Sequence, residues 1–280
     1  MQHELEAFIR NALSEDIGSG DHSSLACIPA EATRRARLLV KEDGVLAGVN
    51  LALEVFRIHD TRLKTTLYMA DGATIRQGDV AFEVEGPAQS ILAVERLVLN
   101  IMQRMSGIAT TTRRVVDLVE GTGVRILDTR KTTPGLRYLE KMAVRIGGGV
   151  NHRFGLYDMI MLKDNHIDYA GGIPQAMVRV RNYMNAHGLR LPVEVEARNM
   201  DEVTLILKEE GVTRIMLDNF DPAQLKAAVA FINRQMETEA SGGITPETVR
   251  AYAETGVDYI SMGALTHSVK SLDLSLKAFD

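Results

Sequence analysis

The spacing of hydrophobic positions changes along the chain and divides the sequence into two regions. Residues 2–17 place apolar side chains three and four positions apart, as on one face of a helix. Short strand-like runs follow, at Arg37–Val40, Arg62–Tyr68 and Val80–Val84. Residues 88–119 have the length and apolar spacing of a long helix, with Gly107 as a candidate break. We therefore expect a mixed region of helices and antiparallel strands up to about residue 113.

After Gly123 the pattern becomes regular, with strand-like apolar runs separated by segments of helical length. The runs are Val124–Asp128, Met159–Leu162, Val193–Ala197, Arg214–Leu217, Thr238–Ser241 and Tyr259–Met262. Helix starts are marked by capping residues at Asn199, Asp221 and Thr245, the last two followed by proline. Such an alternation predicts βα units that form a parallel sheet or barrel.

The composition narrows the class of protein. The 280 residues are 45% hydrophobic and 25% charged, with a mean hydropathy of −0.04, as expected for a folded globular chain. No run reaches the roughly 18–20 apolar residues that cross a bilayer, and the first residues lack a signal-peptide pattern. We expect a cytoplasmic protein without a membrane role. Cys27 is the single cysteine, which excludes an internal disulfide and a CxxC metal site.

Charge is distributed unevenly. The net charge is −5, which argues against a general nucleic-acid binder. Residues 121–163, however, carry eight Lys or Arg and three Asp or Glu, so this stretch is +5 and the remainder is −10. A basic pocket in an acidic protein suits a small anionic ligand, since a long polyanion would be repelled by its surroundings. A solvated basic helix face is the alternative.

Polar side chains follow the apolar runs of the second region. They are Asp128–Lys131, Lys163–His166, Glu194 with Glu196, Asp218-Asn219, Ser241–Gly243, and Ser261 with Gly263. In a βα barrel the carboxyl ends of all strands open onto one face, so these groups are expected to converge on one active-site mouth. Ordinary loop polarity would explain single instances of this pattern, but it explains six successive strand ends poorly.

Alternation within Val193–Ala197 directs Glu194 and Glu196 toward the barrel interior. Buried carboxylates need cationic partners, and Lys131 and Lys163 at neighbouring strand ends are the expected counter-charges. We interpret Glu194 as part of a structural salt bridge. Glu196 lies nearer the mouth and is expected to reach a ligand.

The basic residues differ in the shape of the anion that they suit. Arg130 and Arg153 offer planar forks for carboxylates or phosphates, whereas Lys131 and Lys163 are compact point charges. Together they suit a ligand with several anionic groups, although surface ion pairs remain an alternative for the arginines. His152 and His166 could serve in acid–base chemistry, but a structural or substrate-orienting role is the default interpretation.

Glycine-rich turns end the series of βα units. Ser241-Gly242-Gly243 and Ser261-Met262-Gly263 precede expected helix starts, where backbone N–H groups of barrels often bind phosphate. Gly147–Gly149 is interpreted as a helix terminator. A phosphosugar ligand is therefore expected, and the residues alone leave isomerase, aldolase and glycosyl transferase chemistry open.

Several segments carry a more specific resemblance. They are Glu95–Asn100, Gln103–Thr110, Asp128–Arg137, Gly147–Gly155, Leu162–His166, Glu194–Glu196, Leu217–Asn219 and Glu239–Gly243. In these segments the chain closely resembles the quinolinate phosphoribosyltransferase family. The resemblance implies an N-terminal α/β sandwich domain at residues 1–113, with residues 271–280 packing back on it. It also implies an open, seven-stranded TIM-like α/β barrel at residues 114–270, in a homodimer or larger assembly.

The resemblance also implies roles for individual residues. Arg96 would enter the active site of the neighbouring subunit, while Arg130, His152, Arg153 and Lys163 would hold the two carboxylates of quinolinate. The phosphoribosyl pyrophosphate side, with Mg²⁺, would involve Lys131, Glu196 and Asp218, and the two acids are the implied metal ligands. Thr129 would contact substrate, and Ser241–Gly243 and Ser261–Gly263, with Met262, would bind phosphate.

The implied reaction transfers ribosyl phosphate to the pyridine nitrogen of quinolinate, with release of pyrophosphate and CO₂ and formation of nicotinate mononucleotide. The ring nitrogen is itself a nucleophile, so no general base is assigned. One alternative is a molybdenum-locus protein of similar fold and uncertain substrate. The other is a non-catalytic, phosphosugar-binding barrel.

Overall fold

The computed structural model describes residues 2–279, which form two compact units. The N-terminal unit contains the described residues up to Thr111 and those from Val269 onward. The barrel unit spans Thr112–Ser268. Helix α4 (Ala88–Leu118) begins in the first unit and ends in the second. Among the described helices, none is both long and apolar enough to cross a membrane.

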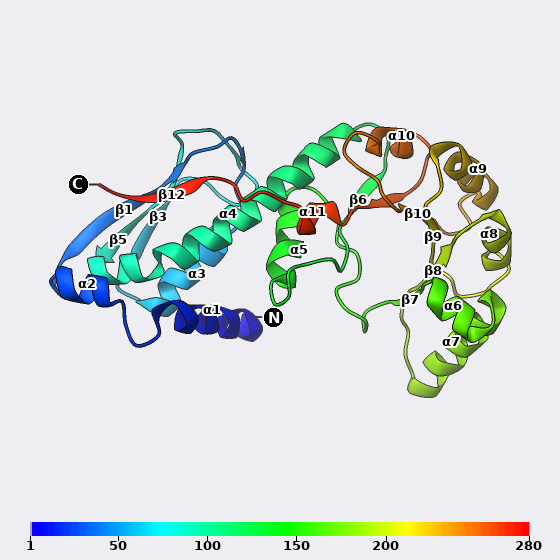
Figure 1. Cartoon of the computed structure of the whole chain (residues 1–280), viewed down its shortest axis with the longest axis horizontal. Helices are drawn as coiled ribbons and strands as arrows, with labels where there is room; N and C mark the ends of the chain where they lie inside the picture. Colours follow the sequence, from blue (N-terminus) through cyan, green and yellow to red (C-terminus); the bar gives the residue numbers. More distant parts are fainter. Residues whose placement is uncertain (1, 280) are drawn as a thin grey trace. The chain divides into compact units, whose positions relative to one another are not determined.

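A four-stranded antiparallel sheet, in the order β12-β1-β5-β3, forms the framework of the N-terminal unit (Figure 1). Its strands are β1 (Thr33–Val40), β3 (Lys64–Leu67), β5 (Val80–Pro87) and β12 (Leu274–Phe279). Strand β12 comes from the end of the chain and pairs with β1 along its length. The antiparallel strands expected in this region are confirmed.

Helices and a small second sheet complete the N-terminal unit. They are α1 (Gln2–Ile17), α2 (His22–Cys27), α3 (Val49–His59), most of α4, and the pair β2 (Gly44–Val45) and β4 (Thr74–Ile75). Helix α3 buries one face, and the ring of Phe56 meets that of Phe82 on β5 edge to face, with centroids 5.8 Å apart. Such pairs contribute about 0.5–1.5 kcal/mol beyond their burial.

Gly107 does not interrupt α4, so the expected break is wrong. A Cβ at this position would collide with the carbonyl oxygen of Lys270. On either side, the hydroxyls of Ser106 and Thr110 each accept a main-chain amide of the segment 45–47 at 2.9 Å. The glycine is therefore explained by the close approach of the C-terminal segment to an unbroken helix.

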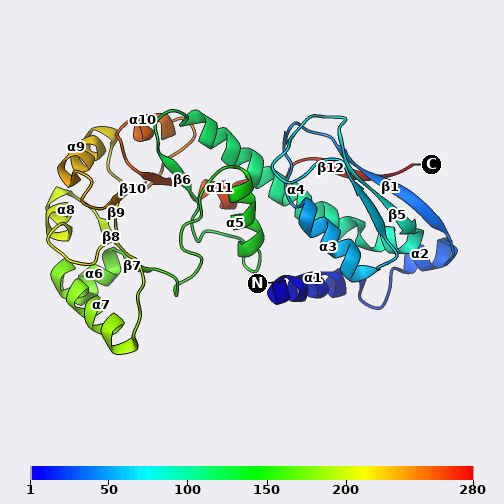
Figure 2. The ribbon, with the colours of Figure 1, turned by 180° about the vertical axis from the view of Figure 1, so that it is seen from behind.

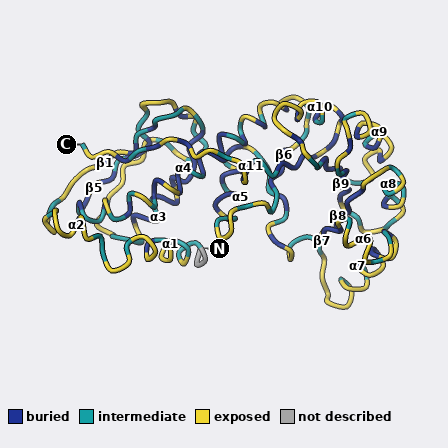
Figure 3. Tube along the Cα trace, viewed as in Figure 1, coloured by how far each residue is buried: buried dark blue, intermediate teal, exposed yellow. Residues whose placement is uncertain are grey.

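Six parallel strands form the sheet of the barrel unit, in the order β6-β11-β10-β9-β8-β7. They are β6 (Arg125–Leu127), β7 (Ile160–Leu162), β8 (Val193–Ala197), β9 (Arg214–Asp218), β10 (Glu237–Ser241) and β11 (Tyr259–Ser261). The predicted parallel sheet is confirmed, and each strand begins and ends within one residue of its predicted bounds. Strand β8 is buried along its whole length (Figure 3).

The resemblance implies seven strands, but the sheet of the described residues has six. After α5 (Arg137–Ile146), Val150 makes only an isolated parallel bridge with Leu127. Two residues later, the main-chain amide of His152 donates to Oδ1 of Asp128 at 2.8 Å. The carboxylate of Asp128 thus accepts an amide that would otherwise donate to the neighbouring strand, and the backbone leaves the sheet.

Helices lie on the outer side of the barrel strands (Figures 1 and 2). They are α6 (Asp164–Ala170), α7 (Ile173–His187), α8 (Met200–Ile206), α9 (Pro222–Ile232) and α10 (Val249–Ala253). The short helix α11 (Ala264–His267) follows β11. The predicted caps at Asn199 and Asp221 are confirmed, since each side chain accepts a main-chain amide of the first turn.

The helix expected to start at Thr245 begins later, at Val249. The hydroxyl of Thr248 accepts the amide of Thr245 at 3.0 Å, and residues 245–248 form a turn ahead of the helix. Helices α10 and α11 have five and four residues. Their dipoles are correspondingly small, so anion binding at these two loops would depend on backbone amides and neighbouring cations.

Candidate active site

A cavity of about 670 Å³ opens at the carboxyl ends of the barrel strands. Its lining includes every site residue predicted within the barrel unit: Thr129, Arg130, Lys131, His152, Arg153, Lys163, Glu196, Asp218, Ser241, Gly242, Gly243, Ser261, Met262 and Gly263. Arg96 is exposed on α4, belongs to the N-terminal unit and does not line this cavity. The predicted convergence of the strand ends is therefore observed within one unit.

Further lining residues were not predicted from the sequence: Met161, Met216, Glu239, Ile244, Thr245, Ala264 and His267. Asp164, which was expected among the polar residues at the strand ends, also lines the cavity. Glu239 has a signal that could have found it, because it alternates with Glu237 along β10 as Glu194 does with Glu196 along β8. His267 lies on the four-residue helix α11, and nothing in its sequence context distinguishes it.

Two guanidinium groups face the cavity without an acidic partner. Neither Arg130 nor Arg153 forms an ion pair among residues 2–279, and Nε of Arg130 is buried without a hydrogen bond. Arg153 donates from Nη1 to the carbonyl of Met159 at 3.2 Å. Burial lowers the pKa of Arg153, and the neighbouring charge of Arg130 lowers it further. Two partly buried like charges at one place favour an anionic ligand between them.

The two lysines of the cavity occupy different environments. Nζ of Lys163 lies 3.9 Å from Oε2 of Glu196, whereas Lys131 is exposed at the mouth. The main chain of Lys131 is held from both sides: its amide donates to Oγ1 of Thr129 at 3.0 Å, and its carbonyl accepts from Oγ1 of Thr266 at 2.8 Å. A Cβ at Gly263 would lie 2.9 Å from Cδ of Lys131, so glycine allows the lysine stem to pass along this loop.

Glu196 and Asp218 bring two carboxylates to the same cavity from adjacent strands. Burial raises the pKa of Glu196, and the charge of Asp218 raises it further. Asp218 accepts a hydrogen bond from Nδ2 of Asn219 at 2.6 Å on one of its oxygens. Oxygen ligands from one or two carboxylates are the usual protein contribution to a Mg²⁺ site, so this pair fits such an ion.

The turn after β10 has a backbone that requires glycine. Gly242 has a φ of +101°, and a Cβ there would collide with the side chain of Asn219. Gly243 follows with a φ of +61° and no atom near its absent Cβ. The resulting loop exposes main chain to the cavity, as a phosphate-binding loop does.

A buried ion pair between Lys141 and Asp128 holds the segment that precedes Arg153. Nζ of Lys141 on α5 lies 2.5 Å from Oδ1 of Asp128 and donates to the carbonyl of His152 at 3.0 Å. Asp128 also accepts from the amide of His152 and from Nδ2 of Asn151. Asp128 was expected among the polar groups of the mouth, and this is wrong: it is fully buried and holds residues 151–153 in place.

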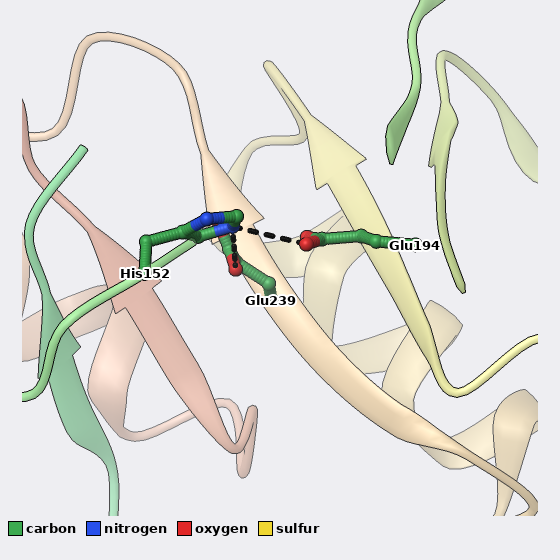
Figure 4. A group of neighbouring side chains, drawn as sticks. All are labelled: His152, Glu194 and Glu239. Carbon is green, nitrogen blue, oxygen red and sulfur yellow. Dashed lines mark ion pairs between the residues drawn. The ribbon is translucent and has the colours of Figure 1, made fainter. Parts of the chain in front are cut away.

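Glu194 is buried in an ion pair, but its partners are not the expected lysines. Nε2 of His152 lies 2.9 Å from Oε2 of Glu194 and 3.4 Å from Oε2 of Glu239 (Figure 4). Arg214 on β9 pairs with Glu239 at 3.2 Å. Nζ of Lys163 lies 3.9 Å from Glu196 instead, and Lys131 is exposed. We call His152, Glu194, Arg214 and Glu239 the buried cluster.

The histidines of the region now have distinct environments. Burial lowers the pKa of His152, whereas the carboxylates of Glu194 and Glu239 raise it. The main-chain amide of Arg153 donates to Nδ1 of His152 at 2.7 Å, which leaves that nitrogen unprotonated and favours the neutral ring. His166 accepts the amide of Lys163 on Nδ1 at 3.0 Å, which caps α6. The structural interpretation of His166 is therefore supported by a specific contact.

The buried cluster also has the spacing of a metal site, since the ligand atoms of His152, Glu194 and Glu239 lie within 4.8 Å of one another. Arg214 already supplies positive charge at the carboxylate of Glu239. A cation bound to Glu239 would be repelled by this guanidinium at short range, so we assign the compensating charge of Glu239 to Arg214.

Comparison with known proteins shows relatives over the whole of both units. The family profile "Quinolinate phosphoribosyl transferase, C-terminal domain" matches residues 108–277, and the corresponding N-terminal domain profile matches residues 21–106. A rice protein named nicotinate-nucleotide pyrophosphorylase [carboxylating], chloroplastic, is 50% identical over 98% of this chain and 78% of its own. A probable nicotinate-nucleotide pyrophosphorylase of Bacillus subtilis is 44% identical over 99% of this chain and 94% of its own.

The solved structures agree with the sequence relatives. NadC from Streptococcus pyogenes superimposes with a TM-score of 0.94 and 38% identity, covering 100% of this chain and 99% of that one. The cationic cavity and its acidic pair agree with the two profile matches, the close relatives and the shared fold. The chain therefore belongs to the quinolinate phosphoribosyltransferase family.

Proposed function

We propose that this chain transfers the phosphoribosyl group of phosphoribosyl pyrophosphate to quinolinate and forms nicotinate mononucleotide, pyrophosphate and CO₂. The observation that carries the proposal is the pairing of Arg130 and Arg153, which face one cavity without acidic partners. A planar dicarboxylate offers each guanidinium an oxygen pair, and Lys163 adds a third positive charge at the same cavity.

The phosphoribosyl side is assigned to the remaining cations and loops of the cavity. Lys131 would neutralise the pyrophosphate, because its ammonium is exposed at the mouth and has no ion pair among the described residues. The turns Ser241–Gly243 and Ser261–Gly263 would receive the 5′-phosphate on hydroxyl and main-chain N–H groups. The cavity therefore holds sites for two anionic substrates side by side, which would orient them for reaction.

The bond changes explain why carboxylates are needed in a cationic cavity. The lone pair of the pyridine nitrogen forms a bond to C1′ of the ribose, while the C1′–O bond breaks and its electrons leave with pyrophosphate. Positive charge develops on the ribose during this step, and Glu196 and Asp218 are placed to stabilise it. Mg²⁺, when bound at these acids, supplies charge neutralisation for the pyrophosphate oxygens.

Loss of CO₂ follows from the new charge on the ring. Once the nitrogen is quaternised, the ring accepts the electron pair of the breaking C2–carboxylate bond, and a solvent proton replaces the CO₂ at C2. The carboxylate that remains becomes that of nicotinate mononucleotide. This step needs no side-chain base, which agrees with the use of the cavity cations as binding groups.

The direct test is release of pyrophosphate in the presence of Mg²⁺ with quinolinate or nicotinate as acceptor. We expect release with quinolinate and none above background with nicotinate, since nicotinate lacks one carboxylate. Equal release with both acceptors would indicate another phosphoribosyltransferase, such as the molybdenum-locus alternative. Absence of quinolinate-dependent release would reject the proposal, and a non-catalytic phosphosugar-binding barrel would then be the better interpretation.

We also propose that the protein acts as a homodimer in which Arg96 completes the active site of the partner. Arg96 is exposed and forms no ion pair with another described residue. We expect Arg96→Ala and Lys131→Ala proteins to be nearly inactive alone and to recover about a quarter of wild-type activity when mixed equally. Half of the dimers would then be mixed, and each would contain one intact pocket of two.

Mixed dimers that have been purified with two affinity tags are expected to show about half of wild-type activity, because one of their two pockets is intact. The matched control is a mixture of Arg96→Ala protein carrying one tag with Arg96→Ala protein carrying the other, which has no intact pocket. If verified mixed dimers stay as inactive as this control, the shared site is wrong.

A further inference from the structure

Both ring nitrogens of His152 lie close to polar groups. Nε2 lies 2.9 Å from Glu194 and 3.4 Å from Glu239, and its side chain is 5% exposed (Figure 4). On the other side of the ring, the main-chain amide of Arg153 donates to Nδ1 at 2.7 Å. The nitrogen that accepts a hydrogen bond must be unprotonated, so the proton of the neutral ring belongs on Nε2.

The charged groups around His152 come from every neighbouring element. Glu194 lies on β8, Arg214 on β9 and Glu239 on β10. From the opposite side, Asp128 accepts the main-chain amide of His152 at 2.8 Å and Lys141 donates to its carbonyl at 3.0 Å. The backbone and the ring of His152 are thus held independently, and both are held by buried ionic groups.

We propose that Glu194 and Glu239 are positioning residues that orient His152 through Nε2, so that Nδ1 of His152 fixes the main chain of Arg153 and places its guanidinium beside Arg130. This inference rests on the proposed function, since it names the residues that hold Arg153 in the proposed quinolinate site. It adds a positioning role to the contact that the family resemblance implies for His152, because Nδ1 accepts the amide of Arg153 while Nε2 faces the two glutamates.

The repulsion between Arg130 and Arg153 explains why a fixed main chain at Arg153 is useful. The charge of Arg130 lowers the pKa of Arg153 beyond the effect of burial, so the two guanidinium groups repel each other. A flexible Arg153 would relieve this repulsion by turning away, and the binding of a dicarboxylate would then have to restore the arrangement. A backbone held by His152 keeps the two guanidinium groups together before the ligand arrives.

The first test replaces Glu239 with an uncharged residue of the same shape. We expect Glu239→Gln to raise KM for quinolinate about tenfold, the size of losing one charge-assisted hydrogen bond, with kcat within about twofold and KM for phosphoribosyl pyrophosphate unchanged. The matched control is Glu237→Gln, which removes the other carboxylate of Arg214 at 3.0 Å but does not touch His152. Equal effects of the two variants would overturn the proposal.

The second test separates a positioning histidine from one that binds the ligand directly. An asparagine places an oxygen near the position of Nδ1, whereas a glutamine mimics Nε2. We expect His152→Asn to keep KM for quinolinate several-fold closer to the wild-type value than His152→Ala or His152→Gln does. A better rescue by glutamine, or equal KM values for all three variants, would contradict the role assigned to Nδ1.

The third test does not depend on the reaction. Nitrogen NMR of the ¹⁵N-histidine-labelled protein at neutral pH, with His152→Asn used to assign the signal, is expected to show Nε2 protonated and Nδ1 unprotonated. Two protonated nitrogens would refute the arrangement even if catalysis behaves as expected. Conversely, a wild-type protein without quinolinate turnover but with this tautomer would reject the proposed function and leave the geometry of the buried cluster intact.

Discussion

Replacement of Glu196 by glutamine is expected to lower kcat by roughly 10²–10³-fold, the effect of removing one preorganised charge that stabilises a transition state. Glu196 lines the cavity, is largely buried, and lies 3.9 Å from Lys163. Its negative charge opposes the positive charge that develops on the ribose, and the amide of glutamine keeps the shape without that charge. KM for quinolinate should change little, because the arginines are untouched.

Three measurements make this prediction specific. Circular dichroism should show an unchanged fold, and Asp201→Asn, which removes an exposed acid from α8, should retain wild-type kcat. A Mg²⁺ titration then separates two roles of the carboxylate. Recovery of full kcat at high Mg²⁺ would mean that Glu196 only holds the ion, and a kcat within threefold of wild type at all Mg²⁺ concentrations would contradict its role entirely.

Replacement of Lys141 by methionine is expected to destabilise the barrel unit by about 3–5 kcal/mol, since it leaves a buried carboxylate without its cation. The ammonium of Lys141 lies 2.5 Å from the fully buried carboxylate of Asp128. For a unit of this size we expect the midpoint of thermal unfolding to fall by roughly 10 °C. The matched control is Arg145→Met, which removes an exposed cation from the same helix.

The loss of stability in Lys141→Met should depend on pH with a definite sign. Burial raises the pKa of Asp128 in the folded protein and the charge of Lys141 opposes this rise, so Lys141→Met should raise the pKa of Asp128 further. A carboxyl group with a raised folded-state pKa stabilises the folded protein at low pH, and this contribution is lost as pH rises through that pKa. The difference from wild type should therefore be smaller at about pH 5 than at about pH 8. A difference that is independent of pH, or equal to that of Arg145→Met, would contradict the ion-pair interpretation.

Periodic features of the fold could be predicted from the sequence because they depend on neighbours in the chain. The caps at Asn199 and Asp221 each involve a residue three positions onward, and the strand Val193–Ala197 is defined by its own apolar residues. The convergence of the cavity residues followed from a property of all parallel βα arrangements, whose strand ends share one face. Local patterns and one general rule were sufficient to bring the strand ends together, but they did not find Glu239 or His267.

Features that depend on distant pairs could not be predicted in this way. Alternation placed Glu194 inside the barrel, but its ion-pair partner, His152, comes from a segment 42 residues away that the local sequence does not place. Gly107 resembled a helix break because the approach of Lys270 is invisible in the local sequence. The expected seventh strand failed for a similar reason, since the carboxylate of Asp128 takes an amide of a segment beyond the next helix.

A crystal structure with bound quinolinate would test the central claim, a cationic cavity that selects a dicarboxylate. We predict that the two carboxylates contact the guanidinium groups of Arg130 and Arg153 and the ammonium of Lys163, with the pyridine nitrogen directed toward Glu196 and Asp218. Quinolinate bound elsewhere on the barrel, or Arg130 and Arg153 directed away from it, would contradict the account.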